Sequence, residues 1–118
     1  MGAVESIGGL SDLLKDKTLL KHSALIGGQW VKAKSGAEFS VINPATGDEI
    51  AKVPNLSVED VQEAINASEQ SFLAWRSMTG KERAAILRKW FNLISENTED
   101  LALIMTHEQG KPLAESRA

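Results

Sequence analysis

Apolar residues between positions 57 and 112 recur every three or four places, which is the spacing of one face of an α-helix. The stretch contains three helix starts, each a hydroxyl residue followed by acids within the next turn: Ser57 with Asp60, Thr79 with Glu82, and Thr98 with Glu99 and Asp100. The pattern therefore predicts three amphipathic helices in succession, and Gly110 marks the end of the third.

The apolar stripes of these helices differ in width. The first stripe consists of Val61, Ile65, Ser68, Phe72 and Trp75. The second stripe is wider and consists of Leu87, Trp90, Phe91 and Ile94, flanked by Ile86 and Leu93, whereas the third consists of Leu101, Ile104 and Met105. One neighbouring helix would not cover the second stripe, so we expect it to pack against further polypeptide.

A fourth helix is predicted where the chain ends. Pro112 fits the first turn of a helix, and residues 113–118 would form about two turns of it. Because no capping residue closes this helix, we expect the 118 residues to be a truncated part of a longer chain.

Residues 24–54 carry the signals of short strands. The strands are expected at residues 24–26, 29–31, 38–41 and 49–53. Gly27-Gly28 favours a tight hairpin between the first two strands, and Asn43–Asp48 forms a turn between the last two. The predicted fold class is α+β, with short antiparallel β-ribbons followed by three to four helices.

The first 23 residues are interpreted as an N-terminal tail. Five leucines would share one side of a short helix after Ser11: Leu10, Leu13, Leu14, Leu19 and Leu20. Met1-Gly2 followed by Ser6 fits the loose myristoylation pattern, but a frayed terminus is favoured because so short a pattern recurs by chance. The tail has no arginine and contains acids, unlike a mitochondrial presequence, so we expect a cytoplasmic protein, with the mitochondrial matrix as the alternative.

Composition restricts the chemistry further. A length of 118 residues suits one domain, and a net charge of −3 gives no basis for binding nucleic acid. No apolar run approaches the length that spans a membrane. The absence of cysteine excludes disulfides and a thiolate nucleophile within these residues. His22 and His107 are too few and too far apart in sequence to suggest a metal site.

Four residue groups that resemble sites are better explained as structure. Glu108, with His107, Gln109 and Lys111, fits a helix end with solvated charges. The basic run is interleaved with acids, which favours a solvated helix face, and it consists of Arg76, Lys81, Arg83, Arg88 and Lys89. The tryptophans are expected to be core anchors: Trp30, Trp75 and Trp90. The glycine pairs match neither the dinucleotide fingerprint nor the phosphate loop: Gly8-Gly9 and Gly27-Gly28.

Five blocks of sequence, in order, resemble the N-terminal part of NAD(P)-dependent aldehyde dehydrogenases. The blocks are LIGGQWV (25–31), VINPATGDEIAKVP (41–54), AINASEQSFLAWR (64–76), KERAAILRKWFNLI (81–94) and EQGKPLAE (108–115). The last two blocks are most similar to the succinate-semialdehyde dehydrogenase branch. The resemblance covers residues 25–118, so residues 24–118 are interpreted as the N-terminal segment of an aldehyde dehydrogenase domain, itself part of that family's α/β fold.

The resemblance implies oxidation of succinate semialdehyde to succinate with NAD or NADP, in the degradation of 4-aminobutyrate. In such enzymes a cysteine thiolate attacks the aldehyde, the cofactor accepts a hydride, and a glutamate activates water. No position of this chain matches those residues, so no catalytic, cofactor-binding or metal residue is assigned and the chain alone is expected to be inactive. Some members hold a cation at positions that correspond to Val41 or Ile42 and to Glu108, where a shorter acid would be usual.

The resemblance also implies partners. The remainder of the dehydrogenase domain would cover the helices, and the full-length enzyme would be a homo-oligomer that binds neither nucleic acid nor membrane. The alternative is a non-catalytic helical interaction module, or a truncated isoform that binds full-length subunits through the second stripe.

Overall fold

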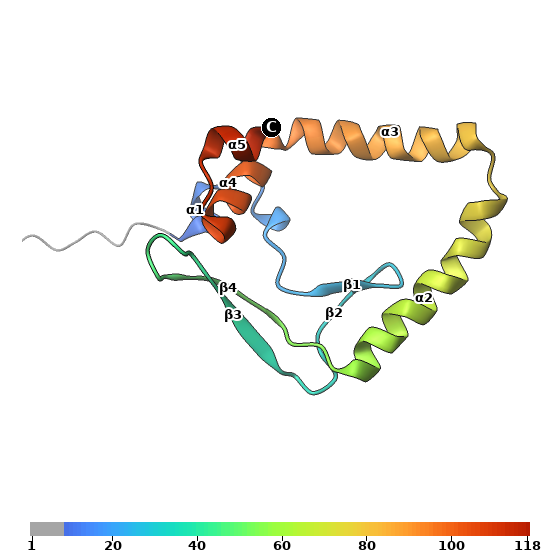
Figure 1. The fold of residues 1–118 in the computed structure, drawn as a ribbon, viewed down its shortest axis with the longest axis horizontal. Helices are drawn as coiled ribbons and strands as arrows, with labels where there is room; N and C mark the ends of the chain where they lie inside the picture. The colour runs from blue at the N-terminus through green and yellow to red at the C-terminus, as the bar shows by residue number, and fades with distance from the viewer. Residues whose placement is uncertain (1–8) are drawn as a thin grey trace, which may run out of the picture.

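The computed structural model describes residues 9–118 as an open frame of helices and ribbons (Figure 1). Its helical segments are α1 (Leu10–Leu13), the 3₁₀ turn η1 (Lys17–Leu19), α2 (Val58–Ser77), α3 (Gly80–Glu96), α4 (Thr98–Gln109) and α5 (Leu113–Arg117). Its strands are β1 (Ala24–Ile26), β2 (Gln29–Val31), β3 (Glu38–Ile42) and β4 (Glu49–Pro54). The radius of gyration is 17.9 Å, against about 13.5 Å for a compact domain of this length.

The four strands form two separate antiparallel ribbons, which confirms the predicted α+β class. In the first, Ala24 of β1 lies opposite Val31 of β2, and the turn between them places Gly27 and Gly28 at positive φ. Only glycine adopts such angles in succession without steric cost, which explains the tight hairpin. In the second ribbon β3 pairs with β4, with an irregularity in register after Val41.

The starts of α2 and α3 are those that the sequence predicts. The Ser57 hydroxyl accepts a hydrogen bond from the Asp60 backbone N–H, and the Asp60 carboxylate accepts one from the Ser57 N–H at 2.9 Å. Thr79 and Glu82 form the same reciprocal pair at the start of α3. Each capping box satisfies two backbone donors that a helix N-terminus leaves free.

The start of α4 lacks the capping box that α2 and α3 have. The helix begins at Thr98, but its N-cap residue is Asn97, which makes no side-chain cap hydrogen bond. Because only Asn97 separates α3 from α4, the Thr98 hydroxyl reaches back and donates to the Ser95 carbonyl at 2.9 Å. The α5 helix begins at Leu113, as the sequence predicts, and α1 begins at Leu10, one residue before Ser11.

The buried core lies at one corner of the frame, and the N-terminal segment supplies most of it. Leu10, Leu14 and Leu20 are buried together and pack against side chains from β4 and α4: Ile50, Leu103 and Ile104. We refer to α1, η1, the β3–β4 ribbon, α4 and α5 as the packed corner. The myristoylation pattern at Met1–Ser6 and the first glycine of the pair at 8–9 lie outside the described residues.

The α2 and α3 helices extend away from this corner and form the opposite part of the frame (Figure 1). We refer to them as the α2–α3 arm. No apolar side chain of either helix is buried. The arm touches the rest of the described chain where α2 meets β1 and where α3 meets α4. At the first contact Ala67 of α2 lies against Gly27, and Lys34 forms an ion pair with Glu63.

Candidate functional site

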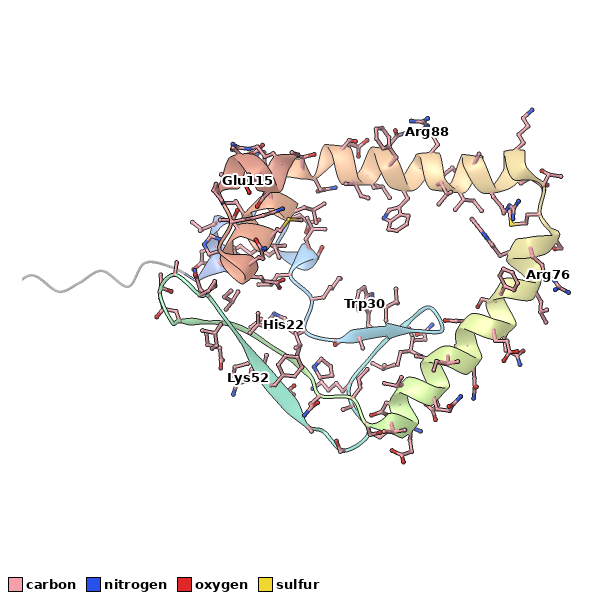
Figure 2. The ribbon with its side chains drawn as sticks, in the orientation of Figure 1. His22, Trp30, Lys52, Arg76, Arg88 and Glu115 are labelled. Atoms are coloured by element: carbon pink, nitrogen blue, oxygen red, sulfur yellow. The ribbon has the colours of Figure 1, made fainter. Side chains whose placement is uncertain are left out.

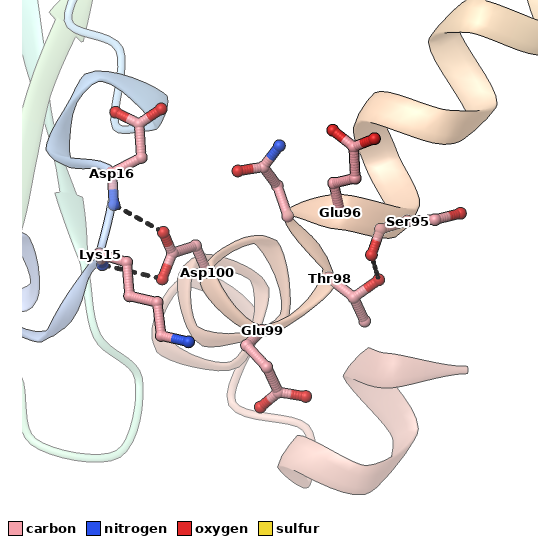
Figure 3. Close-up of a pocket in the computed structure, with 8 residues that line it drawn as sticks. Lys15, Asp16, Ser95, Glu96, Thr98, Glu99 and Asp100 are labelled. Atoms are coloured by element: carbon pink, nitrogen blue, oxygen red, sulfur yellow. Dashed lines mark hydrogen bonds between the residues drawn. The ribbon is translucent and has the colours of Figure 1, made fainter.

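A hollow lies where the N-terminal segment meets the junction of α3 and α4 (Figure 3). Its volume is about 440 Å³, and its lining residues are Lys15, Asp16, Ser95, Glu96, Asn97, Thr98, Glu99 and Asp100. The hollow contains four acids and one lysine, together with the first backbone amides of α4. Such a mixture could form a binding site only if some of these groups lacked partners inside the protein.

Three of the four acids in the hollow, Asp16, Glu99 and Asp100, already accept hydrogen bonds from the protein. The buried Asp100 carboxylate accepts the backbone N–H of Lys15 at 3.0 Å through Oδ1 and that of Asp16 at 2.8 Å through Oδ2 (Figure 3). Glu99 accepts two hydrogen bonds from Arg117, each 2.9 Å long, and these lower the pKa of the Glu99 carboxyl. Within residues 9–118, every buried side-chain nitrogen and oxygen has a hydrogen-bond partner. The hollow therefore lies at a structural contact between the N-terminal segment and α4, which we call the joint.

The joint contains a residue whose role the sequence did not reveal. Asp100 was interpreted only as a favourable charge at a helix N-terminus. Its carboxylate instead fastens the N-terminal segment to α4 across 84 positions of sequence. The acid at the start of a helix was visible in the sequence, but no local pattern indicated a partner so far away.

The C-terminal end of α4 is a capped helix terminus, as the sequence indicates. Gly110 has φ +82°, and its N–H donates to the Thr106 carbonyl at 2.8 Å. A Cβ at Gly110 would lie 2.9 Å from Cγ of Pro44, so the Asn43–Asp48 turn packs directly on this helix end. His107 hydrogen-bonds the Leu103 carbonyl through Nδ1 at 2.8 Å.

The positions that the resemblance associates with a cation lie on two elements, Val41 and Ile42 on β3 and Glu108 on α4. His107, from α4, lines the hollow that contains Asn43 and Thr46. The Glu108 side chain lines a different groove, together with Met105 and Ser116. Within the part of the chain that the structure describes, no group of three or more His, Cys, Asp or Glu residues is arranged to hold a metal ion.

The basic run on the arm is a solvated face. Arg76 and Arg88 point away from the body of the frame (Figure 2). Arg88 lies over the ring of Phe91 at 5.0 Å, and both side chains are exposed at the surface. These exposed side chains agree with the solvated helix face that the sequence predicts.

The tryptophans are not core anchors among residues 9–118. Trp30 and Trp90 are 52% and 63% exposed, and Trp75 is partly buried. Trp30 carries the ammonium of Lys21 at 4.7 Å from its ring centre (Figure 2). The expected burial is therefore wrong for Trp30 and Trp90 in the part of the chain that the structure describes.

The described residues do not fit a dinucleotide. A Rossmann-type site needs a parallel strand, a glycine-rich turn and the N-terminus of the following helix. Gly27 and Gly28 instead form the tip of an antiparallel hairpin, and β2 follows them directly. No step of a hydride transfer can be assigned to these residues.

None of the helices in residues 9–118 combines the length and apolarity that a bilayer crossing needs.

Comparison with known proteins gives the context of this frame. The model of the aldehyde dehydrogenase family matches residues 30–118. The chain is 50% identical over 103 residues to 3-sulfolactaldehyde dehydrogenase of Pseudomonas putida, covering 87% of this chain and 21% of that protein. It is 48% identical over 104 residues to the NADP⁺-dependent succinate-semialdehyde dehydrogenase of Escherichia coli K12, covering 88% and 22%.

Solved structures show the same arrangement in space. An aldehyde dehydrogenase from Brucella melitensis biovar abortus 2308 superposes with a TM-score of 0.86 at 55% identity, covering 88% of this chain and 22% of that one. A succinate-semialdehyde dehydrogenase from Burkholderia pseudomallei gives 0.85 at 51% identity, with the same coverage. The chain spans about a fifth of the length of the relatives that it matches. By sequence and by fold, this chain belongs to the aldehyde dehydrogenase family.

Proposed function

We propose that this chain is the N-terminal segment of an NAD(P)-dependent dehydrogenase that oxidises succinate semialdehyde to succinate, in 4-aminobutyrate degradation. The observation that carries the proposal is its 48% identity to the E. coli succinate-semialdehyde dehydrogenase over 104 residues. In this proposal the segment does not supply the thiolate nucleophile, because it has no cysteine. Its contribution is structural: it provides capped helices and ribbons on which the catalytic parts are built.

The names of four relatives that are 44–50% identical to this chain support a class of substrate. They act on succinate, glutarate and aspartate semialdehydes and on 3-sulfolactaldehyde. Each of these aldehydes carries a carboxylate or sulfonate at the end opposite the reacting carbon. The proposed substrate class is therefore an aldehyde with a remote anionic group, and succinate semialdehyde is the member that we favour.

The test uses the natural protein. An antibody against residues 82–94 captures the polypeptide from its source, its intact mass is measured, and NADH or NADPH formation is followed by absorbance. We expect a mass several times the 12.8 kDa of this chain and turnover of succinate semialdehyde. Butanal, which has four carbons but no carboxylate, is the matched control and should react more slowly. Equal rates for the two aldehydes would overturn the substrate class.

The exposed stripe of α3 favours a second candidate function. Leu87, Trp90 and Phe91 are all about half exposed or more, as in a helix that binds another protein. The candidate is a short isoform that binds full-length dehydrogenase subunits. It requires the captured polypeptide to have the mass of 118 residues and to elute with full-length subunits in size-exclusion chromatography.

Assembly and location complete the proposal. We propose a homo-oligomer in the cytoplasm, with the mitochondrial matrix as the alternative, since relatives from rice and gibbon are named as mitochondrial. Light scattering of the captured protein gives the number of subunits. Fractionation of the source cells with the same antibody distinguishes the two compartments.

A further inference from the structure

The N-terminal segment lies on the packed corner in the manner of a bound peptide. We refer to residues 9–20 as the strap. Its buried side chains are those of Leu10, Leu14 and Leu20, and most of the residues between them are exposed. The strap also precedes residues 30–118, which are the part that the family model matches. Membership of the family therefore does not define what the strap does.

Contacts within the strap give it a local shape of its own. The Lys17 ammonium lies 3.3 Å from the Asp12 carboxylate. The Asp16 carboxylate accepts the Thr18 backbone N–H at 2.9 Å. These contacts join residues that are five and two positions apart, so they do not require the rest of the protein. The strap can therefore leave the corner, or return to it, as one unit.

The surface under the strap combines an apolar part with one carboxylate. The Asp100 carboxylate accepts the backbone N–H groups of Lys15 and Asp16 (Figure 3). These two amides follow the end of α1 and have no helical acceptor, so the carboxylate satisfies them. We refer to this surface as the strap groove, and it consists of Ile50 of β4 with Asp100, Leu103 and Ile104 of α4.

Contacts that do not involve the strap hold the walls of the strap groove. Near the start of α4, Glu99 accepts two hydrogen bonds of 2.9 Å from Arg117 of α5. At the end of α4, a Cβ at Gly110 would lie 2.9 Å from Cγ of Pro44, so the turn between β3 and β4 packs on the helix. The groove should therefore keep its shape when the strap leaves it.

We infer that the strap groove is a peptide-binding site and that residues 9–20 of the same chain occupy it as a releasable strap. The groove fits a segment that has two leucines four residues apart, as at Leu10 and Leu14, followed directly by two residues with free amide hydrogens. Release of the strap opens the groove to an equivalent segment supplied from outside. The inference does not depend on which aldehyde the proposed enzyme oxidises.

Hydrogen exchange of the unsubstituted 118-residue chain tests the release. A strap that leaves the corner by itself exposes its amides through a local opening, without unfolding of α4. We expect the amides of Lys15 and Asp16 to exchange at least about tenfold faster than that of Leu103, yet more slowly than in a free peptide of residues 9–20. Rates equal to that of Leu103, or equal to those of the free peptide, would overturn the inference.

Binding of a separate peptide tests the groove. Leu14→Ala weakens the strap within the 118-residue chain, and a fluorescent synthetic peptide of residues 9–20 is then added. Fluorescence anisotropy should show binding to this variant that is at least about tenfold tighter than to the unsubstituted chain, whose own strap competes from a high effective concentration. The control is the same peptide with Leu14→Ala, which should bind at least about tenfold more weakly than the unsubstituted peptide.

A second release variant removes an amide hydrogen and leaves the leucines in place. Lys15→Pro lacks the N–H that Asp100 accepts, and Leu14 already has the extended backbone that a following proline favours. Lys15→Ala is the matched control, because it keeps the amide and removes only the lysine side chain. The Lys15→Pro chain should bind the added peptide about tenfold more tightly than the Lys15→Ala chain does.

Hydrogen exchange of α4 in both release variants completes the test. If α4 stays protected but neither variant binds the peptide, no groove remains and the inference is overturned. Loss of protection in α4 of both variants would mean that the strap is an integral part of the core, which also overturns it. Equal binding of the unsubstituted peptide and its Leu14→Ala control would contradict the leucine pattern that defines the site.

Discussion

The packed corner and the α2–α3 arm differ in how well their helices are capped and in what surrounds those helices. The arm has two reciprocal capping boxes, whereas α4 begins without a side-chain cap and α5 is only five residues long. Yet the corner contains the leucine core, and the arm contains no buried apolar residue. Good local signals thus define where a helix begins, while burial decides which helices hold the fold together.

The largest contrast is expected from removing one apolar side chain in each region. Leu14 is 5% exposed, so Leu14→Ala should lower the free energy of unfolding by about 3 kcal/mol, through lost burial and the cavity that remains. Trp90→Ala in the arm should change it by less than about 0.5 kcal/mol, because its ring is already in water. Urea titration of the 118-residue chain, followed by circular dichroism, measures both. A larger loss for Trp90→Ala would reverse the comparison.

The next contrast concerns the joint at Asp100. Asp100→Ala should leave two backbone donors without their carboxylate and lower the free energy of unfolding by about 2 kcal/mol. Asp100→Asn keeps one acceptor oxygen and should lose about half as much. Hydrogen exchange should become faster at Lys15 and Asp16 and stay unchanged in α2. Unchanged exchange at those two amides would show that other groups hold the segment.

Substitutions at Gly110 and Gly47 distinguish the cost of backbone strain from the cost of a steric clash. Gly110→Ala and Gly47→Ala both place a Cβ at a φ near +80°, which costs about 1 kcal/mol. Only at Gly110 does the new Cβ meet another side chain, 2.9 Å from Cγ of Pro44, so Gly110→Ala should be the more destabilising of the two. Thermal unfolding of both variants gives the difference. Equal losses would mean that the Pro44 turn moves aside freely.

Two threonines at helix starts test the capping boxes. Thr79→Ala removes a hydroxyl that accepts the Glu82 N–H and should cost about 1 kcal/mol of helix stability in the arm. Thr98→Ala removes a hydroxyl that only donates to the end of α3, so its effect should be smaller. The helical signal in circular dichroism measures both changes. A greater loss from Thr98→Ala would contradict the assignment of Asn97 as the cap.

The smallest effect concerns pH. Hydrogen bonds from the Thr79 backbone and hydroxyl lower the pKa of the Glu82 carboxyl below its usual value. The capping contribution should therefore be complete above the unfolded pKa of about 4.3 and be lost as the pH falls through the lower folded pKa. Carboxyl NMR titration measures the Glu82 pKa. A value at or above the unfolded pKa of about 4.3 would contradict the prediction.

The sequence predicted the elements that depend on neighbours along the chain. Ser57 and Thr79 with their acids, the glycines at 27 and 28, and Gly110 all act within a few residues, so their patterns were sufficient. The open shape was partly predictable too, because the apolar stripe of α3 is wider than one helix can cover.

What the sequence could not reveal depends on partners far away in the chain. Leu10 and Leu14 looked like part of a tail, although they pack against residues of α4 about 90 positions later. Thr98 looked like Thr79, and only the short link through Asn97 distinguishes their roles. The prediction that the chain holds no catalytic residue rests on residue types, since no cysteine occurs anywhere in the chain, and it stays a prediction.

The joint at Asp100 also determines which substitutions the N-terminal segment can accept at positions 15 and 16. Its carboxylate holds backbone amides and no side chain of the N-terminal segment. Position 15 can therefore change to almost any residue without loosening the joint, whereas proline, which lacks the amide hydrogen, would remove the bond. A joint of this kind leaves its own segment free to diverge, so related chains could share the joint while showing little similarity at these positions.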